Sequence, residues 1–291
     1  MQKQHGKPLE TMDVVAFVSM TLFALAIFFP FYNAVLTSLM SAKEYTQHPV
    51  TLFPREIVLD SYRFLLGKDL VGKAYLSSIF ITASGSAFGL TVSVLMAYGF
   101  SRARFPGKKF LFRLILFTMF FDGGLIPTYI LLKNLKLIDN RLAIILLCGV
   151  STFNIILLKS SFEQTPAALE EAAKIDGAND IRVFWSILLP LQMPILATIT
   201  LFLAVGYWNE WFWSMLVLNS RHKQTLQLLL RSLITEASAE TEMMSAAVSD
   251  NVFSQGVKMA AVIVTMLPIM LVYPFVQKYF VKGLLVGAIK M

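Results

Sequence analysis

The sequence has little charge and very few residues that bind metals or form disulfides. Only 15% of its 291 residues are charged, 56% are hydrophobic, and there are one cysteine and three histidines. A single cysteine, Cys148, cannot form a disulfide within the chain. So few potential ligands exclude a clustered zinc, haem or iron–sulfur site. A soluble protein of this length would need far more polar surface. The composition therefore predicts an all-α integral membrane protein.

Several apolar runs are long enough to cross a bilayer, which takes about 20 helical residues. They must be helical, because unpaired backbone groups in hydrocarbon are costly. Six spans are predicted: 14–39, 75–100, 110–132, 142–162, 191–218 and 258–280. The first follows Lys3 and Lys7, as in a signal peptide, but it is too long for one and has no clear cleavage site. The predicted division is an N-terminus (1–13), a transmembrane domain (14–281) and a C-terminal tail (282–291).

The basic residues predict an orientation rather than a nucleic-acid partner. The net charge is +7, but Lys and Arg are spread over the loops instead of gathering on one face. Five basic residues fall between Arg102 and Arg113, in one very short loop, where the positive-inside rule acts best. This density favours a cytoplasmic position for that loop and both termini, and an outer position for the segments 40–74 and 219–256, although the basic residues divide nearly evenly between the two sides.

The second span carries a small residue at every fourth position. Gly85, Gly89, Ser93 and Ala97 form this stripe, and such a stripe lets another helix approach closely. We interpret it as a helix-packing seam.

The longest polar interval in the middle of the chain runs from Glu170 to Pro194. It opens with strong helix formers and acidic residues, which suit a helix N-terminus. Gly177 can adopt the positive φ that ends a helix, and Asn179 and Asp180 can cap the next one. Pro190 and Pro194 mark the entry to the fifth span. Four apolar residues are spaced to share one face of the second helix: Ile181, Phe184, Ile187 and Leu188.

From Glu171 to Pro190 this interval follows the pattern E-A-A-x3-G-x9-I-x-L-P. The pattern closely resembles the cytoplasmic loop of ABC-importer permeases, the membrane subunits that are moved by a separate ATPase. The stretches 122–127, 208–210 and 280–290 are similar to those of carbohydrate-uptake permeases of the maltose-transporter type. Within that family the chain is most similar to a subgroup for oligosaccharides or polysaccharide fragments, which includes alginate importers.

The resemblance implies the type I ABC-importer permease fold: six transmembrane helices and a cytoplasmic coupling loop, residues 163–190. It also implies a multi-pass protein of the bacterial cytoplasmic (inner) membrane. The implied partners are a second homologous permease in a heterodimer, two ATP-binding subunits and an extracytoplasmic solute-binding protein. The residues expected at the ATPase contact are Glu170, Glu171, Ala172, Ala173, Asp176, Gly177, Ile187, Leu189 and Pro190.

This chain is not expected to bind a cofactor or to catalyse a reaction; ATP and magnesium would belong to the partner subunits. Gly67, Gly72 and Lys73 match the frame of a P-loop, but Ala74 stands where that motif needs a hydroxyl for magnesium. No paired carboxylates or nucleophile–base set indicates an enzyme.

Ionisable groups inside predicted spans indicate a substrate path, because they are expensive there and are often functional. Asp122 precedes Gly123, Gly124 and Pro127, which can break the third helix where the backbone lines a cavity. Glu210 lies among aromatic residues and an amide, a combination suited to sugars. An interfacial aromatic belt explains the tryptophans equally well. The predicted path residues are Asp122, Gly123, Gly124, Tyr207, Trp208, Asn209, Glu210 and Trp211.

Three alternatives stay open from the sequence. A secondary, ion-coupled transporter of a small polar solute is the main one, although inverted repeats are absent and intramembrane charge is sparse. The polar interval can also be an interfacial helix pair without a partner. The segment 219–256 either faces an extracytoplasmic partner or is a solvated connector.

Overall fold

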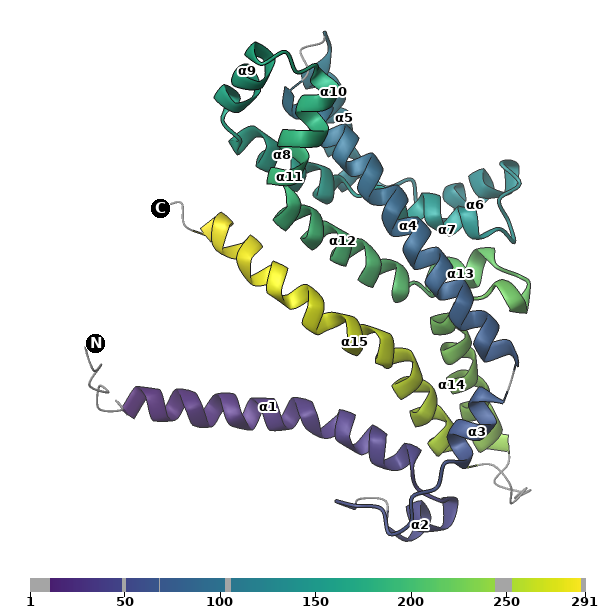
Figure 1. Ribbon diagram of the computed structural model, residues 1–291. Helices are drawn as coiled ribbons and strands as arrows, with labels where there is room; N and C mark the ends of the chain where they lie inside the picture. Colours follow the sequence, from purple (N-terminus) through teal and green to yellow (C-terminus); the bar gives the residue numbers. More distant parts are fainter. Residues whose placement is uncertain (1–10, 49–50, 68, 103–105, 244–252, 289–291) are drawn as a thin grey trace. The chain divides into compact units, whose positions relative to one another are not determined.

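The computed structural model describes residues 11–48, 51–67, 69–102, 106–243 and 253–288. Every regular element in these residues is a helix, and none of them forms a strand (Figure 1). The chain divides into two compact units. Unit 1 is formed within residues 1–67 and 233–265, and unit 2 within residues 68–232 and 266–291.

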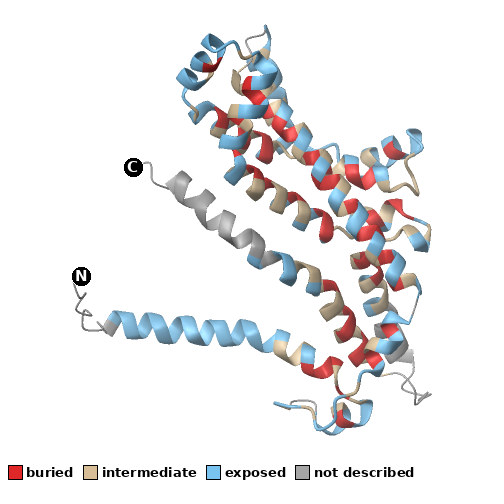
Figure 2. Ribbon diagram, in the orientation of Figure 1, coloured by how far each residue is buried: buried red, intermediate tan, exposed pale blue. Residues whose placement is uncertain are grey.

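Unit 1 contains three whole helices and parts of two others. They are α1 (Thr11–Ser38), α2 (Ala42–Gln47) and α3 (Asp60–Leu66), with the end of α14 (Leu226–Met243) and the start of α15 (Ser254–Ala288). Most described side chains of α1 are exposed and apolar, as in a helix that faces lipid or another subunit (Figure 2).

Unit 2 holds the remaining helices. They are α4 (Asp69–Arg102), α5 (Lys108–Phe120), α6 (Leu125–Asn134), α7 (Arg141–Gly149), α8 (Thr152–Gln164), α9 (Ala167–Ile175), α10 (Asp180–Val183), η1 (Phe184–Leu188), α11 (Leu189–Leu191), α12 (Met193–Trp208), α13 (Phe212–Val217) and η2 (Arg221–Lys223), with the rest of α14 and α15.

The predicted spans are helical, but several of them are broken. The break expected near Gly123 is present: α5 and α6 meet at 115°. The predicted fourth span is divided into α7 and α8, which bend by 48°, and the fifth ends at Trp208, before α13. Three described helices are long and apolar enough to cross a membrane, or up to six if each bent pair is one span. The count of six therefore stays a prediction.

The C-terminal end of the chain agrees only in part with the predicted division into a transmembrane domain and a tail. The helix α15 continues to Ala288, so most of the predicted tail is helical. Lys3, Lys7 and residues 289–291 lie outside the described residues.

Helix α4 is the axis of unit 2, and α7, α8 and α12 pack along it (Figures 1 and 2). The predicted stripe of small residues lies at this contact and is buried. A methyl group on Gly89 would lie 2.4 Å from the carbonyl oxygen of Gly149 in α7, and one on Gly85 would lie 2.4 Å from the ring of Tyr207 in α12. The packing seam is confirmed.

A polar cluster around Asp139 joins the α6–α7 turn to the segment after α13. The Asp139 carboxylate accepts hydrogen bonds from the backbone of Asn219 and Ser220 at 3.1 and 2.9 Å, from the Ser220 hydroxyl at 2.6 Å and from Lys223 at 2.7 Å. These donors, Lys223 first, hold the pKa of Asp139 well below its usual range. The clamp therefore depends on the ionised carboxylate.

Replacing Gly89 by Ala should destabilise the protein by about 1–3 kcal/mol, because the added methyl group meets backbone that cannot turn aside. The measurement is the thermal midpoint of the purified protein in detergent. Gly99→Ala is the matched control, since a Cβ at Gly99 in the same helix meets no atom within 4 Å. Equal midpoints for the two variants would contradict the close α4–α7 contact.

Replacing Asp139 by Asn should lower the stability at neutral pH by roughly 2 kcal/mol, the scale of a hydrogen bond to a charged group. Because the folded-state pKa is depressed, the ionised carboxylate stabilises the fold above the unfolded-state value of about 3.9. That contribution is lost as the pH falls below this value. Thermal midpoints across the acid range should therefore converge for the two proteins, whereas the exposed Asp69→Asn variant should follow wild type throughout.

Candidate functional site

The turn in the coupling loop is built as the sequence predicts. Helix α9 ends at Ile175 with Asp176 as its C-cap, and the next residue, Gly177, has a φ of 80°. The N–H groups of Gly177 and Ala178 donate to the carbonyls of Lys174 and Ala173 at 3.1 and 2.9 Å, the pattern of a Schellman motif. Asn179 then caps α10 by accepting from the N–H of Arg182 at 2.8 Å. The loop therefore holds two short helices at a fixed angle.

The inner side of the loop is continuous with the core of unit 2. Ala173, Val183, Phe184 and Leu188 are buried and belong to the same cluster as residues of α4, α8 and α12. The ring of Phe184 lies 4.7 Å from that of Tyr98 in α4. The loop is thus attached to the helices by packing as well as by the chain.

Four apolar residues are expected to share one face of the second helix, and for one of them the prediction is wrong. Ile181 is 71% exposed, whereas Phe184 and Leu188 are buried and Ile187 is partly buried. Ile181 lies in α10, before the π-helical turn Phe184–Leu188 that places Phe184 and Leu188 on one side. A π turn has more residues than an α-helical turn, so the α-helical spacing no longer predicts which side chains share a face.

Polar contacts clamp the two ends of the loop together. Buried Gln192, at the bend between α11 and α12, donates to the Thr165 hydroxyl at 2.9 Å and accepts from Ser161 of α8. Arg102 at the end of α4 donates to the Thr165 carbonyl at 2.7 Å. Its Nε also lies 2.7 Å from Glu170 Oε1, as an ion pair rather than an aligned hydrogen bond, and both side chains are less than one-fifth exposed. Displacing the loop therefore displaces α4, α8 and α12.

The tip of the loop presents apolar side chains to the surroundings. Ile175 is 85% exposed, and Glu171, Ala172, Asp176 and Ile181 are exposed beside it in the sequence. Lys174 and Asp180 form an ion pair of 2.9 Å across the turn. Exposed apolar groups on a rigid base are typical of a contact surface for another protein.

The predicted ATPase-contact residues thus fall into different environments. Glu171, Ala172, Asp176, Gly177 and Pro190 are exposed, and Ile187 and Leu189 are partly buried against the core. Glu170 faces Arg102, and Ala173 is buried. Only the exposed set is available to a partner.

Asp122 lies in the break between α5 and α6. One of its carboxylate oxygens accepts from the N–H of Gly124 at 3.0 Å, and Gly124 has a φ of 85°. Asp122, Gly123 and Gly124 are all exposed. Among the described residues, no hydrogen bond, ion pair or ring contact connects this break with the stretch 207–211.

The predicted path residues of the stretch 207–211 separate in the structure. Tyr207 is buried and donates to the carbonyl of Ile145 at 2.6 Å, and Trp208 packs edge-on against Tyr75 at 5.8 Å. Asn209 accepts from Gln227 of α14 at 3.2 Å. The Arg231 guanidinium lies 3.7 Å from the ring centroid of Trp211. Glu210 accepts from the N–H of Trp213 at 2.6 Å, which caps α13.

Tyr207 and Glu210 line a cavity of about 360 Å³ in unit 2. The other lining residues come from the α7–α8 break and from α12: Cys148, Ser151, Phe153, Asn154, Phe202, Leu203 and Gly206. The sequence prediction missed the contribution of α7 and α8. The signal that pointed to it was Asn154, an amide inside an apolar run.

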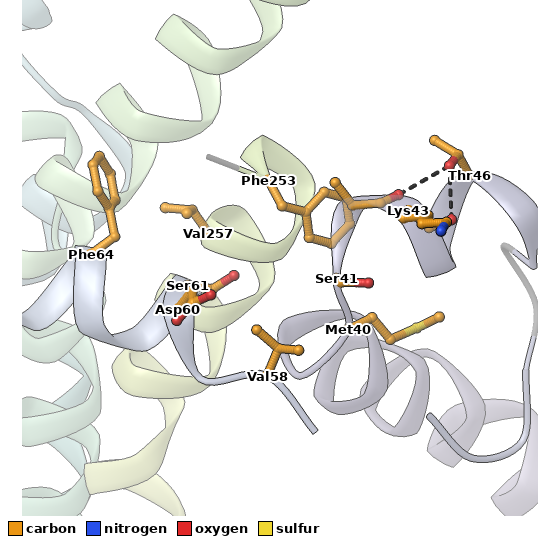
Figure 3. A pocket seen from close by; sticks show the side chains of 11 residues that line it. Met40, Ser41, Lys43, Thr46, Val58, Asp60, Ser61, Phe64, Phe253 and Val257 are labelled. Carbon is orange, nitrogen blue, oxygen red and sulfur yellow. Dashed lines mark hydrogen bonds between the residues drawn. The ribbon is translucent and has the colours of Figure 1, made fainter. Parts of the chain in front are cut away.

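A second cavity, of about 640 Å³, lies in unit 1. Residues from Met40 to Phe64 form most of its wall, and Phe253 and Val257 complete it (Figure 3). The ring of Phe253 lies 5.1 Å from that of Tyr45. The segment after α1 and the segment before α15, both predicted to be extracytoplasmic, therefore meet in one structure.

Comparisons with known proteins agree on one family. The family model described as the inner membrane component of binding-protein-dependent transport systems matches residues 89–286. The polygalacturonan/rhamnogalacturonan transport system permease protein YtcP of Bacillus subtilis (strain 168) is 40% identical, over 96% of this chain and 98% of YtcP. Protein LplC of the same organism is 39% identical, over 90% and 88%.

Solved structures show the same fold. A chain in the crystal structure of a bacterial ABC transporter involved in the import of the acidic polysaccharide alginate is 34% identical. It aligns with a TM-score of 0.87 over 96% of this chain and 100% of its own length. A chain of the alginate transporter in complex with a pentasaccharide-bound periplasmic protein aligns at 0.61 with 14% identity, a likeness of fold alone. The predicted fold class is confirmed.

Proposed function

Because the chain belongs to the family of inner membrane components of binding-protein-dependent transport systems, we propose that it is a permease subunit of an ATP-driven carbohydrate importer. It would move an oligosaccharide or polysaccharide fragment from a solute-binding protein into the cytoplasm by alternating access. Relatives named for transport of polygalacturonan, rhamnogalacturonan and alginate support a fragment that includes uronates.

The coupling loop is the observation that carries this proposal. Its exposed tip offers Glu171, Ala172 and Ile175 to a partner, while its base is clamped to α4, α8 and α12. When two ATP-binding subunits close, a force on the tip would pass into these three helices rather than deform the loop. ATP and magnesium belong to those subunits, and this chain performs no bond chemistry.

The same proposal includes the remaining partners and the orientation of the chain in the membrane. The complex would include a second homologous permease, and both termini of this chain would be cytoplasmic. The unit 1 cavity combines the two predicted extracytoplasmic segments, which supports docking of the solute-binding protein there. In this arrangement the segment 219–256 is more than a solvated connector.

A secondary transporter driven by an ion gradient is the second candidate. It would need ionisable groups along its path, and the described path residues offer Asp122 and Glu210 without a contact between them. Uptake into vesicles that hold the whole complex distinguishes the two mechanisms. Uptake should require internal ATP and persist with an ionophore; uptake without ATP that collapses with the ionophore would refute the proposal.

Replacing Glu171 by Ala should uncouple ATP hydrolysis from uptake, because Glu171 is exposed at the tip and its side chain makes no hydrogen bond or ion pair with the residues that the structure describes. We expect transport per ATP to fall about tenfold, the scale of a side chain central to an interface. The measurement compares ATPase activity and uptake in the same vesicles.

The neighbouring variant Glu170→Ala is the matched control. It leaves Arg102 without its carboxylate partner, so it should lower the thermal midpoint, whereas Glu171→Ala should keep the wild-type midpoint. A fully coupled Glu171→Ala transporter would contradict the docking role of the tip.

A further inference from the structure

The cavity at the α7–α8 break contains a buried amide that lacks a partner. Asn154 lines it and is only 4% exposed, yet its side chain makes no hydrogen bond within the part of the chain that the structure describes. A buried amide without a partner is destabilising. The amide of Asn154 is open to the cavity, so a hydrogen-bonding group that enters the cavity can pair with it.

Glu210 gives the cavity its one formal charge. One carboxylate oxygen accepts from the N–H of Trp213 at 2.6 Å, and the other accepts no hydrogen bond from the residues described. None of the lining residues is Lys or Arg. The free oxygen can therefore accept a hydrogen bond from a ligand, and a second carboxylate would meet an unscreened negative charge.

Two phenylalanines also line the cavity. Phe153 and Phe202 are 52% and 41% exposed, and both line the cavity. The volume of about 360 Å³ lies at the lower end of the range for small-molecule sites. An apolar wall facing a few polar groups matches a ligand with C–H faces and hydroxyl edges.

We propose that this cavity is a subsite for one uncharged sugar ring, bound through its hydroxyl groups by Asn154 and Glu210. A hydroxyl both donates and accepts, so it satisfies the amide and the carboxylate together. A uronate carboxylate only accepts, so it cannot donate to Glu210 and is excluded here. This inference rests on the proposed function: in an acidic fragment, the rings that pass this point would be the neutral ones.

Cys148 provides the probe, because it lines the cavity and is the only cysteine in the chain. The whole transporter in nanodiscs would be alkylated with N-ethylmaleimide, and modification of the Cys148 peptide followed by mass spectrometry. The ligands are digalacturonate and its methyl ester, which share a skeleton and differ in charge. The ester should slow alkylation about tenfold, the scale of one hydrogen bond, and digalacturonate less than about twofold.

Two substitutions separate the roles of the polar groups. Asn154→Leu should abolish protection by the ester, because it removes the amide that binds the sugar hydroxyl. Asn134→Leu, exposed at the end of α6, should change neither the protection nor the midpoint. Glu210→Gln should let digalacturonate protect as well as the ester.

Several results would overturn the inference. Alkylation that neither sugar slows, while ATP-driven uptake continues, would refute the subsite and leave the proposed function intact. Equal protection by both sugars in the wild type would refute the exclusion of uronates. A Cys148 that reacts only after unfolding would show that the cavity is closed. Failure of ATP-driven uptake for every saccharide would instead count against the proposed function.

Discussion

In lipid, no hydrophobic effect distinguishes one apolar helix face from another, so the helices of unit 2 depend on close contact. Gly85 and Gly89 of α4 make that contact possible, because at both positions a Cβ would overlap a neighbouring helix. The approach at Gly89 brings α4 against the end of α7. Tyr207, whose ring lies over Gly85, donates to the carbonyl of Ile145. The position of α12 is therefore set by two glycines and one hydrogen bond.

The same contact determines what the coupling loop can move. The buried cluster runs without interruption from Tyr207 and Leu203 of α12 to Phe184 and Val183 in the loop. Gln192 and Arg102 close the base of the loop on both sides. Because the loop and the helix bundle share one core, the proposed displacement of the loop would be transmitted as a rigid-body motion rather than absorbed locally.

The sequence predicts most of what depends on local chemistry. The turn at Gly177, the Asn179 cap, the break after Asp122 and the small-residue seam follow from φ preference, capping and side-chain size, and each is present. The prediction fails where tertiary contacts decide. The π turn at Phe184 changes which apolar residues are buried. The α7–α8 break contains no glycine–proline pair from which it could be predicted. The separation of Trp208, Asn209 and Glu210 depends on α13 and α14, whose positions the sequence does not encode locally.

The breaks in the helices explain where polar groups survive among apolar ones. A continuous helix uses its own backbone donors, whereas a broken one leaves donors and acceptors that side chains or ligands must satisfy. Asp122 satisfies the break between α5 and α6 by accepting from Gly124, and Glu210, after the end of α12, accepts from the first turn of α13. At the α7–α8 break the polar group is Asn154, and the described residues do not satisfy it. Asn154 and Glu210 both line the cavity, so the polar groups at the α7–α8 break and at the end of α12 meet there.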